Sequence, residues 1–213
     1  MYTNFEKLDE SKKERILNAA LAEFARNGYR KASTNEIVKE AGISKGILFH
    51  YFKDKMNLYR YIYDYSVQTL MDELYGKLSS ESQDFMERIM EITRAKGQLV
   101  LKHPELFRFI ETAYLDDAEE ARSYMDGKTA AILKEAQGKM LSGTDVSKFK
   151  DGIDIAKAMQ IITWTFDGYG KTVFTKAKAE GSDIDYEKIF SESEEYLKLL
   201  KKMLYKDDGG NWE

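Results

Sequence analysis

The segment Gly42–Lys55, GISKGILFHYFKDK, mixes cationic and bulky apolar side chains within a short stretch of chain. Its basic side chains belong to Lys45, His50, Lys53 and Lys55. Such groups donate hydrogen bonds to phosphates and base edges, and neighbouring rings such as Phe49 supply apolar contacts. A helix that only filled a core would not carry these cations, and a solvated helix would not carry these aromatics. The mixture predicts a surface that lies against a charged partner.

The charge distribution of the chain favours a polyanion as that partner. Residues 12–60 hold 11 Lys or Arg against 5 Asp or Glu, a local excess of +6. Because the whole chain of 213 residues carries −4, the remaining residues sum to −10. A basic segment on an acidic body predicts nucleic-acid binding by the first segment only.

The sequence indicates no catalytic site, no metal site and no cofactor. Cysteine is absent, His50 and His103 are the only histidines, and no nucleophile motif or phosphate-binding glycine loop occurs. Asp116 and Asp117 are adjacent carboxylates, but they precede an acidic helix and we interpret them as caps. An enzyme is therefore the weaker alternative, and measured turnover would be needed to revive it.

The chain also lacks the signals of a membrane protein. No apolar run approaches the roughly 18 residues of a membrane span, and residues 1–10 lack the basic-then-apolar pattern of a signal peptide. The absence of cysteine is compatible with a reducing compartment. We expect a cytoplasmic protein without a membrane partner.

Three short helices are predicted to position the Gly42–Lys55 segment. The first starts at the capping box of Ser11 and Glu14 and stops at Gly28. The second runs from the capping box of Ser33 and Glu36 to Gly42. The third has Ser44 as its N-cap. Two short helices joined by a glycine-containing turn are typical of the helix-turn-helix, whose second helix enters the DNA major groove.

The phase of the third helix separates its core residues from its free face. Leu48 and Phe52, four residues apart, form the stripe that faces the neighbouring helices. This leaves six residues on or near the free face: Lys45, Gly46, Ile47, Phe49, His50 and Tyr51. Gly46 has no side chain, so the helix start can approach a phosphate or base edge closely.

The rest of the chain predicts longer amphipathic helices and therefore an all-α fold. These helices cover about residues 55–79, 83–102, 104–114, 117–141, 152–179 and 185–205. The single proline, Pro104, suits the first position of a helix. We expect a helix-turn-helix domain over residues 1–54 and a larger helical domain over residues 55–213.

Residues 15–59, RILNAALAEFARNGYRKASTNEIVKEAGISKGILFHYFKDKMNLY, resemble the DNA-binding domain of the TetR family of transcriptional repressors. The segment AGISKGILFHYFKDK is the most specific part of the match, which covers about a quarter of the chain. The resemblance implies a homodimer whose N-terminal domains present their third helices to the halves of a palindromic operator. It also implies a helical body that takes up a ligand and releases the DNA, and that serves for ligand binding and dimerisation.

The resemblance also implies roles for individual residues. Thr34 matches a phosphate-contacting position, Lys45, Gly46 and His50 match groove-facing positions, and Tyr51 and Lys55 match positions that touch the DNA backbone. Ile47 and Phe49 depart from the threonine and tyrosine common there, so one hydroxyl is missing at each. The predicted DNA-binding set is Thr34, Ser44, Lys45, Gly46, Ile47, Phe49, His50, Tyr51 and Lys55.

In the body, the predicted ligand-binding residues are Met90, Phe107, Met159, Trp164 and Phe166. The helix at 152–179 is apolar on two sides, which predicts burial on both sides. In a TetR-like body those sides are the ligand cavity and the dimer seam. Asp167, within this apolar stretch, is either a partner for a cationic ligand or a carboxylate at a rim or interface. Glycines within predicted helices, Gly97 and Gly168 among them, indicate close packing or room for a ligand.

The sequence thus predicts a ligand-responsive DNA-binding regulator. The resemblance favours a repressor, and the sequence itself does not separate a repressor from an activator. It is expected to bind a palindromic operator as a homodimer and to be released by a small apolar effector. The alternative is a constitutive DNA-binding or protein-interaction module whose core is filled.

Overall fold

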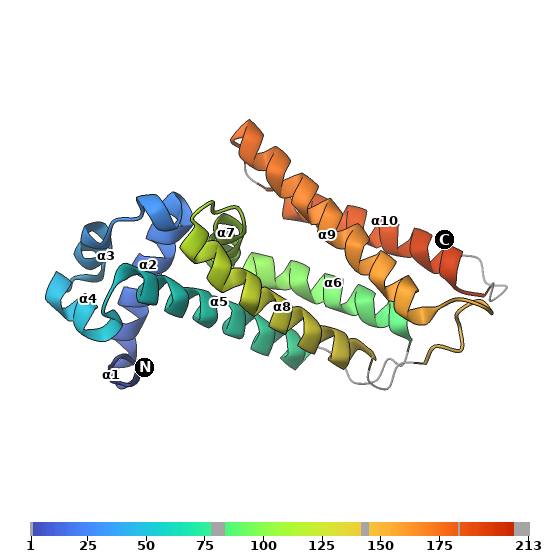
Figure 1. The fold of residues 1–213 in the computed structure, drawn as a ribbon, viewed down its shortest axis with the longest axis horizontal. Helices are drawn as coiled ribbons and strands as arrows, with labels where there is room; N and C mark the ends of the chain where they lie inside the picture. The colour runs from blue at the N-terminus through green and yellow to red at the C-terminus, as the bar shows by residue number, and fades with distance from the viewer. Residues whose placement is uncertain (1, 78–83, 142–144, 183, 207–213) are drawn as a thin grey trace. The chain divides into compact units, whose positions relative to one another are not determined.

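The computed structural model describes residues 2–77, 84–141, 145–182 and 184–206 (Figure 1). Within these ranges the chain forms ten helices and no strand, which confirms the all-α prediction. The helices are α1 Thr3–Glu6, α2 Glu10–Lys31, α3 Thr34–Ala41, α4 Lys45–Phe52, α5 Lys55–Lys77, α6 Phe85–Lys102, α7 Pro104–Tyr114, α8 Glu119–Leu141, α9 Ile155–Glu180 and α10 Tyr186–Leu204.

The predicted helices of the body all occur, because long amphipathic periods and strong end signals define them. Pro104 is the first residue of α7, as expected for a residue whose missing N–H is not needed there. The largest shift is at α9, which starts at Ile155 rather than at residue 152. The predicted break at residues 79–80 lies outside the described residues.

Two details at the N-terminus differ from the prediction. The N-cap of α2 is Asp9, whose carboxylate accepts a hydrogen bond from Lys12 N at 2.9 Å, so the Ser11 cap was wrong. Asp and Ser are equally good caps, and the Asp9 cap lengthens the helix by two residues. Gly28 breaks the helix with φ 65° and ψ 179°, as predicted, but the chain resumes helical geometry as far as Lys31.

The chain divides into two compact units. Unit 1 comprises Met1–Glu73 and Lys102–Leu133, and unit 2 comprises Leu74–Leu101 and Lys134–Glu213. The predicted boundary between residues 54 and 55 falls within unit 1 and stays a prediction. No helix in the described ranges is both long and apolar enough to cross a membrane.

The core of unit 1 forms where α2 packs on α3 and α7. Phe24 of α2 meets Tyr59 of α5 edge to face at 5.0 Å between ring centroids, and Tyr59 meets Phe109 of α7 at 5.5 Å. All three rings are fully buried. Burial raises the pKa of the Tyr59 hydroxyl, helped by the nearby charge of Asp116. This aromatic cluster joins the helix-turn-helix region to α7 within one core.

A buried carboxylate ties the end of α2 to the segment before α8. Asp116 Oδ2 accepts a hydrogen bond from Tyr29 N at 2.6 Å, and its Oδ1 accepts one from Ala118 N at 2.9 Å. Gly28 lies so close that a Cβ there would be 3.1 Å from Asp116 Oδ2. Asp116 therefore serves two helix ends, whereas the sequence predicted only the cap near α8.

Unit 2 has its own core between α6, α9 and α10. Its fully buried residues include Phe85 and Met86 of α6, Met159 and Ile162 of α9, and Leu197 of α10. Beside this core the Asp84 carboxylate accepts hydrogen bonds from Lys148 Nζ at 2.8 Å and from the Tyr205 hydroxyl at 3.1 Å. A buried carboxylate with two such donors is satisfied and fixes the segments on which they lie.

Candidate nucleic-acid interface

The α3–α4 pair has the local signals of a helix-turn-helix. The Ser33 hydroxyl accepts a hydrogen bond from Glu36 N at 3.4 Å, and the Ser44 hydroxyl accepts one from Ile47 N at 3.3 Å. Gly42, between the helices, adopts the left-handed conformation with φ 66° and ψ 38°. Glycine takes this conformation without a Cβ clash, so α3 stops sharply and α4 starts in a new direction.

The burial pattern of α4 confirms its predicted inner stripe. Leu48 and Phe52 have 0% of their surface exposed, and the Phe52 ring lies 4.7 Å from that of Phe5 and 5.4 Å from that of Tyr61. Fixing α4 by this stripe leaves its other side to solvent. The exposed residues there are Lys45, Gly46, Ile47 and His50.

The remaining predicted residues of α4 are half-buried. Lys45 Nζ lies 5.8 Å from the centroid of the Phe49 ring, so the cation and the ring share one part of the surface. The Tyr51 ring lies 5.5 Å from the His50 ring and 5.8 Å from that of Phe5. Phe49 and Tyr51 therefore border the exposed face of α4 and also touch protein.

Three other predicted residues lie around α4. Ser44 is exposed at the start of the helix, and Thr34 is half-buried as the first residue of α3. Lys55 Nζ donates hydrogen bonds to Arg30 O at 3.1 Å and Ala32 O at 3.2 Å. It satisfies carbonyls at the end of α2, a structural role that the sequence did not predict. The DNA contact of Lys55 stays a prediction.

The sequence missed the contribution of α1 to this region. Phe5 is completely buried and packs on Tyr51, Phe52 and Tyr61. The Tyr61 hydroxyl donates to the Glu6 carboxylate, and this hydrogen bond lowers the pKa of Glu6. A helix of four residues is too short for a periodicity signal, so only its apolar Phe5 could have drawn notice.

The predicted ligand-binding residues divide into three groups. Met159 is buried in the core of unit 2, and Met90 and Phe166 pack against that core half-buried. Trp164 of α9 is 63% exposed, so it does not line this core in the single chain. Phe107 lies on α7 in unit 1. The structure thus brings three of the five together.

The helical glycines also divide by environment. A Cβ on Gly97 of α6 would lie 3.2 Å from the Phe190 ring of α10, so close helix packing explains this glycine. A Cβ on Gly168 or Gly170 of α9 would meet no atom of the described residues within 4 Å. These two glycines therefore lie on an uncovered part of α9.

Comparisons with known proteins agree with the geometry of α3 and α4. Residues 16–62 match the family model of bacterial regulatory proteins, tetR family. The chain is 27% identical over 162 residues to the fatty acid metabolism regulator protein of Bacillus subtilis (strain 168), covering 71% of this chain and 78% of the relative.

Solved structures have the same fold over nearly the whole chain. A TetR-family transcriptional regulator from Rhodococcus sp. superposes with a TM-score of 0.71 at 17% identity, covering 91% of this chain and 100% of the other. The regulator FadR from Bacillus subtilis, in complex with stearoyl-CoA, superposes with a TM-score of 0.61 at 21% identity, covering 88% and 96%.

These relatives are regulators rather than enzymes, and the family match covers the helices that carry the exposed face of α4. Residues 16–62 therefore form a DNA-binding domain of the tetR family, and the chain as a whole is similar to TetR-family transcriptional regulators in sequence and fold.

Proposed function

We propose that this regulator is a homodimeric repressor that binds a palindromic operator and is released by a mostly apolar effector. The observation that carries the proposal is the exposed apolar surface of unit 2. Trp164 of α9 and Leu199 and Met203 of α10 are 63%, 54% and 59% exposed. Large apolar side chains gathered on neighbouring helices favour burial against another surface.

A second copy of the chain is the partner that this surface suits. Ile161, Trp164 and Gly168 of α9 follow one helical track, and the bare Gly168 lets a facing helix approach closely. Recognition helices must lie about 34 Å apart to meet successive major grooves, which requires a rigid seam between two copies. A two-fold seam built from α9 and α10 would meet this requirement and would match a palindromic site.

On the DNA side, α4 supplies groups of the right kind on its exposed face. Lys45 and His50 are proposed to donate to base edges, Gly46 to allow close approach, and Ile47, 36% exposed, to contact a thymine methyl. Thr34, Ser44, Tyr51 and Lys55 are proposed to contact phosphates, and Phe49 to support Lys45. The charge excess of +6 over residues 12–60 supports attraction to the DNA backbone.

The effector is proposed to carry a long acyl or other apolar portion. A fatty acid metabolism regulator and a regulator in complex with stearoyl-CoA are both similar to this chain, which supports an acyl ligand. Met90, Met159 and Phe166 of unit 2 are candidates for the wall around that portion. Phe107 stays a candidate from unit 1, and Trp164 fits the dimer seam better than the wall because it is exposed.

Lys96 of α6 is a candidate for orienting the polar end of the effector. Lys96 is exposed in the described structure, and the nearby charge of Asp167 on α9 favours its charged form. An exposed ammonium group remains accessible to an anionic head group. Asp167 then acts as the partner of Lys96 in the ligand-free chain.

A constitutive regulator is the second candidate, and the packing of unit 2 favours it. Met159 and Ile162 are buried in a continuous apolar core with Phe85 and Leu197. A core that is already filled leaves no room for an acyl chain unless α6, α9 and α10 move apart.

The test starts by selecting an operator from a random duplex pool at moderate salt with the full chain. Stearoyl-CoA and free coenzyme A are then titrated, with Trp164 fluorescence as the signal in a Trp212→Phe background. We expect stearoyl-CoA, but not free coenzyme A, to change Trp164 fluorescence and to weaken operator affinity about 5- to 150-fold, with the reciprocal effect of operator on stearoyl-CoA binding.

His50→Ala should cost about 1–3 kcal/mol at the selected operator and little on random duplex. Selection of no sequence would contradict the operator proposal. A folded dimer that binds stearoyl-CoA without any change in operator affinity would instead support the constitutive regulator.

A further inference from the structure

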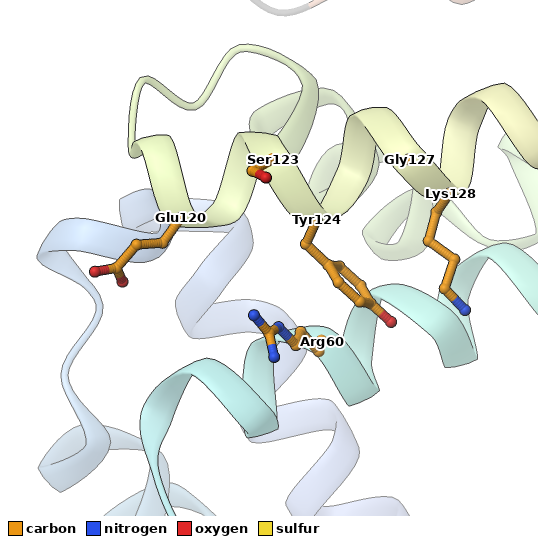
Figure 2. Close-up of a pocket in the computed structure, with 6 residues that line it drawn as sticks. All are labelled: Arg60, Glu120, Ser123, Tyr124, Gly127 and Lys128. Atoms are coloured by element: carbon orange, nitrogen blue, oxygen red, sulfur yellow. The ribbon is translucent and has the colours of Figure 1, made fainter.

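A cleft of about 580 Å³ lies between α5 and α8 within unit 1, apart from the exposed face of α4 and from the core of unit 2. Figure 2 shows Arg60 rising from α5 toward α8, with Tyr124 and Lys128 on one side of it and Glu120 on the other. The lining residues are Arg60, Glu120, Ser123, Tyr124, Gly127 and Lys128. The proposed contacts with DNA and with the apolar effector use none of them.

Arg60 is the unusual residue of this cleft. Its guanidinium lies 5.0 Å from the centroid of the Tyr124 ring, a cation–π contact. Its Nε is buried, and no acceptor in the described part of the chain lies within hydrogen-bond distance. A buried donor without an acceptor is costly, and it calls for a ligand, an ion or a water. The stacked guanidinium keeps a planar edge of donors that suits an oxyanion.

The stacking partner of Arg60 is held in place by the rest of the cleft. The Tyr124 hydroxyl donates to Asp64 Oδ2 at 2.6 Å, which links α8 to α5. Lys128 Nζ lies 3.2 Å from Asp64 Oδ1 and 5.7 Å from the centroid of the same Tyr124 ring. Asp64 pairs with Lys128, and Arg60 forms no ion pair within the described part of the chain, although the Glu120 carboxylate lines the same cleft. A site whose side chains are already fixed loses little entropy on binding.

Glu120 limits where an anion can lie in the cleft. Its carboxylate accepts a hydrogen bond from the Tyr29 hydroxyl at 3.4 Å and lies on the opposite side of Arg60 from Lys128 (Figure 2). Repulsion from this carboxylate directs an anion toward Arg60, Tyr124 and Lys128. The exposed Ser123 supplies one more hydroxyl donor on α8 at the cleft.

We propose that this cleft binds the phosphate group of a small phosphorylated molecule, with the Arg60 guanidinium as the main donor and Lys128 as the second cation. A phosphate matches the planar donor edge of arginine and carries more charge than a single carboxylate. The ligand would bridge α5 and α8 within unit 1. Since α5 starts three residues after the end of α4, this site offers a second input to the DNA-binding region.

The experiment uses the full chain in a phosphate-free chloride buffer at constant ionic strength. Inorganic phosphate, pyrophosphate and malonate are titrated by calorimetry into the wild type, Arg60→Gln, Lys128→Gln and the control Arg108→Gln. Arg108 is an exposed arginine of α7 in the same unit, 3.5 Å from Glu105 and outside the cleft. Thermal melts by circular dichroism check that each variant is folded.

We expect one saturable site for each chain, with pyrophosphate bound more tightly than malonate. Arg60→Gln should weaken pyrophosphate binding about tenfold or more, because a charged hydrogen bond is lost. Lys128→Gln should weaken it about threefold, and Arg108→Gln should leave it unchanged. If Arg60→Gln does not fold, Lys128→Gln decides alone, and unchanged affinity in that variant overturns the proposal.

Three further results would overturn it. They are the absence of saturable binding, equal affinity of Arg60→Gln and the wild type, and tighter binding of malonate than of pyrophosphate. A random DNA duplex distinguishes a small ligand from DNA phosphates as the occupant. Competition of the duplex with pyrophosphate, together with weaker duplex binding by Arg60→Gln, would assign the cleft to the DNA interface and overturn the small-ligand proposal.

Discussion

Helix α4 and the helix pair α9–α10 differ in how far their apolar side chains are buried within the single chain. In α4, Leu48 and Phe52 are fully buried within unit 1, and the exposed side consists of polar or small residues with Ile47. In α9 and α10, Met159 and Leu197 are buried, but Trp164 and Leu199 remain exposed. The apolar stripe of α4 is therefore buried within one chain, whereas unit 2 has large apolar side chains that stay exposed in the single chain.

The two regions also differ in charge. Residues 12–60 carry +6, and the rest of the chain carries −10. A polyanion is therefore attracted to residues 12–60 and repelled by the acidic remainder of the chain. The difference in core closure and in charge agrees with the proposal that the first region binds DNA and that the second binds apolar partners.

The largest expected effect comes from opening the core beneath α4. Phe52→Ala removes a ring with 0% exposure that contacts Phe5 and Tyr61. It should lower the free energy of unfolding by about 3–5 kcal/mol in urea denaturation. Phe49→Ala, at a half-buried position on the same helix, should cost clearly less. Equal costs would mean that the inner and outer sides of α4 are not distinct.

The next effect tests whether unit 2 needs a second chain. Leu199→Asp places a charge within the proposed seam and should weaken dimerisation by about 2–4 kcal/mol, measured by light scattering over a concentration series. Leu101→Asp is the matched control, because Leu101 of α6 is also exposed in unit 2 but lies outside α9 and α10. If both variants weaken dimerisation equally, the dimer seam does not consist of α9 and α10.

A smaller effect is expected at the break in α2. Gly28 has φ 65° and ψ 179°, a conformation reserved for glycine, and a Cβ would be 3.1 Å from Asp116 Oδ2. Gly28→Ala should cost about 1–3 kcal/mol of unfolding free energy through backbone strain and crowding. Gly42→Ala should cost about 1–2 kcal/mol from backbone strain alone, since no atom of the described residues crowds that site. Thermal melts of the two variants separate crowding from strain.

The smallest effect concerns the acid stability of unit 2. Burial alone would raise the pKa of Asp84, but hydrogen bonds from Lys148, Glu87 N and Tyr205 lower it below the ordinary 3.8. A carboxylate with a lowered folded-state pKa stabilises the fold above its unfolded pKa, and this stabilisation disappears as pH falls through the folded pKa.

Asp84→Asn should therefore cost about 1–2 kcal/mol at pH 7 and progressively less as pH falls through the lowered folded-state pKa, measured by urea denaturation across pH. Asp151→Asn is a control on an exposed carboxylate, 2.9 Å from Lys206 Nζ, and should alter the curve by less than about 1 kcal/mol. A cost of Asp84→Asn that persists unchanged into acid would show that the carboxylate charge is not what stabilises unit 2.

Residues that act on near neighbours could be predicted from the sequence. Ser33, Gly42 and Ser44 bound the helices as predicted, because capping acts over three or four residues of chain. The stripe of Leu48 and Phe52 followed from helical phase alone. Local signals therefore determined the all-α class, the helix-turn-helix and the exposed face of α4.

Tertiary structure alone decided the contacts between distant residues. Asp116 bonds to Tyr29 N across 87 positions, and Lys55 bonds to Arg30 O across 25. The apolar residues around Trp164 predicted a pocket-lining role for it. Trp164 is 63% exposed, because the side of α9 that carries Met159 and Ile162 is the one packed into the core of unit 2. Arg60 showed no special pattern until α8 brought Tyr124 beside it. Packing between segments remote in sequence decides which side of a helix is buried and which charged groups are paired. Short-range propensity does not encode this packing.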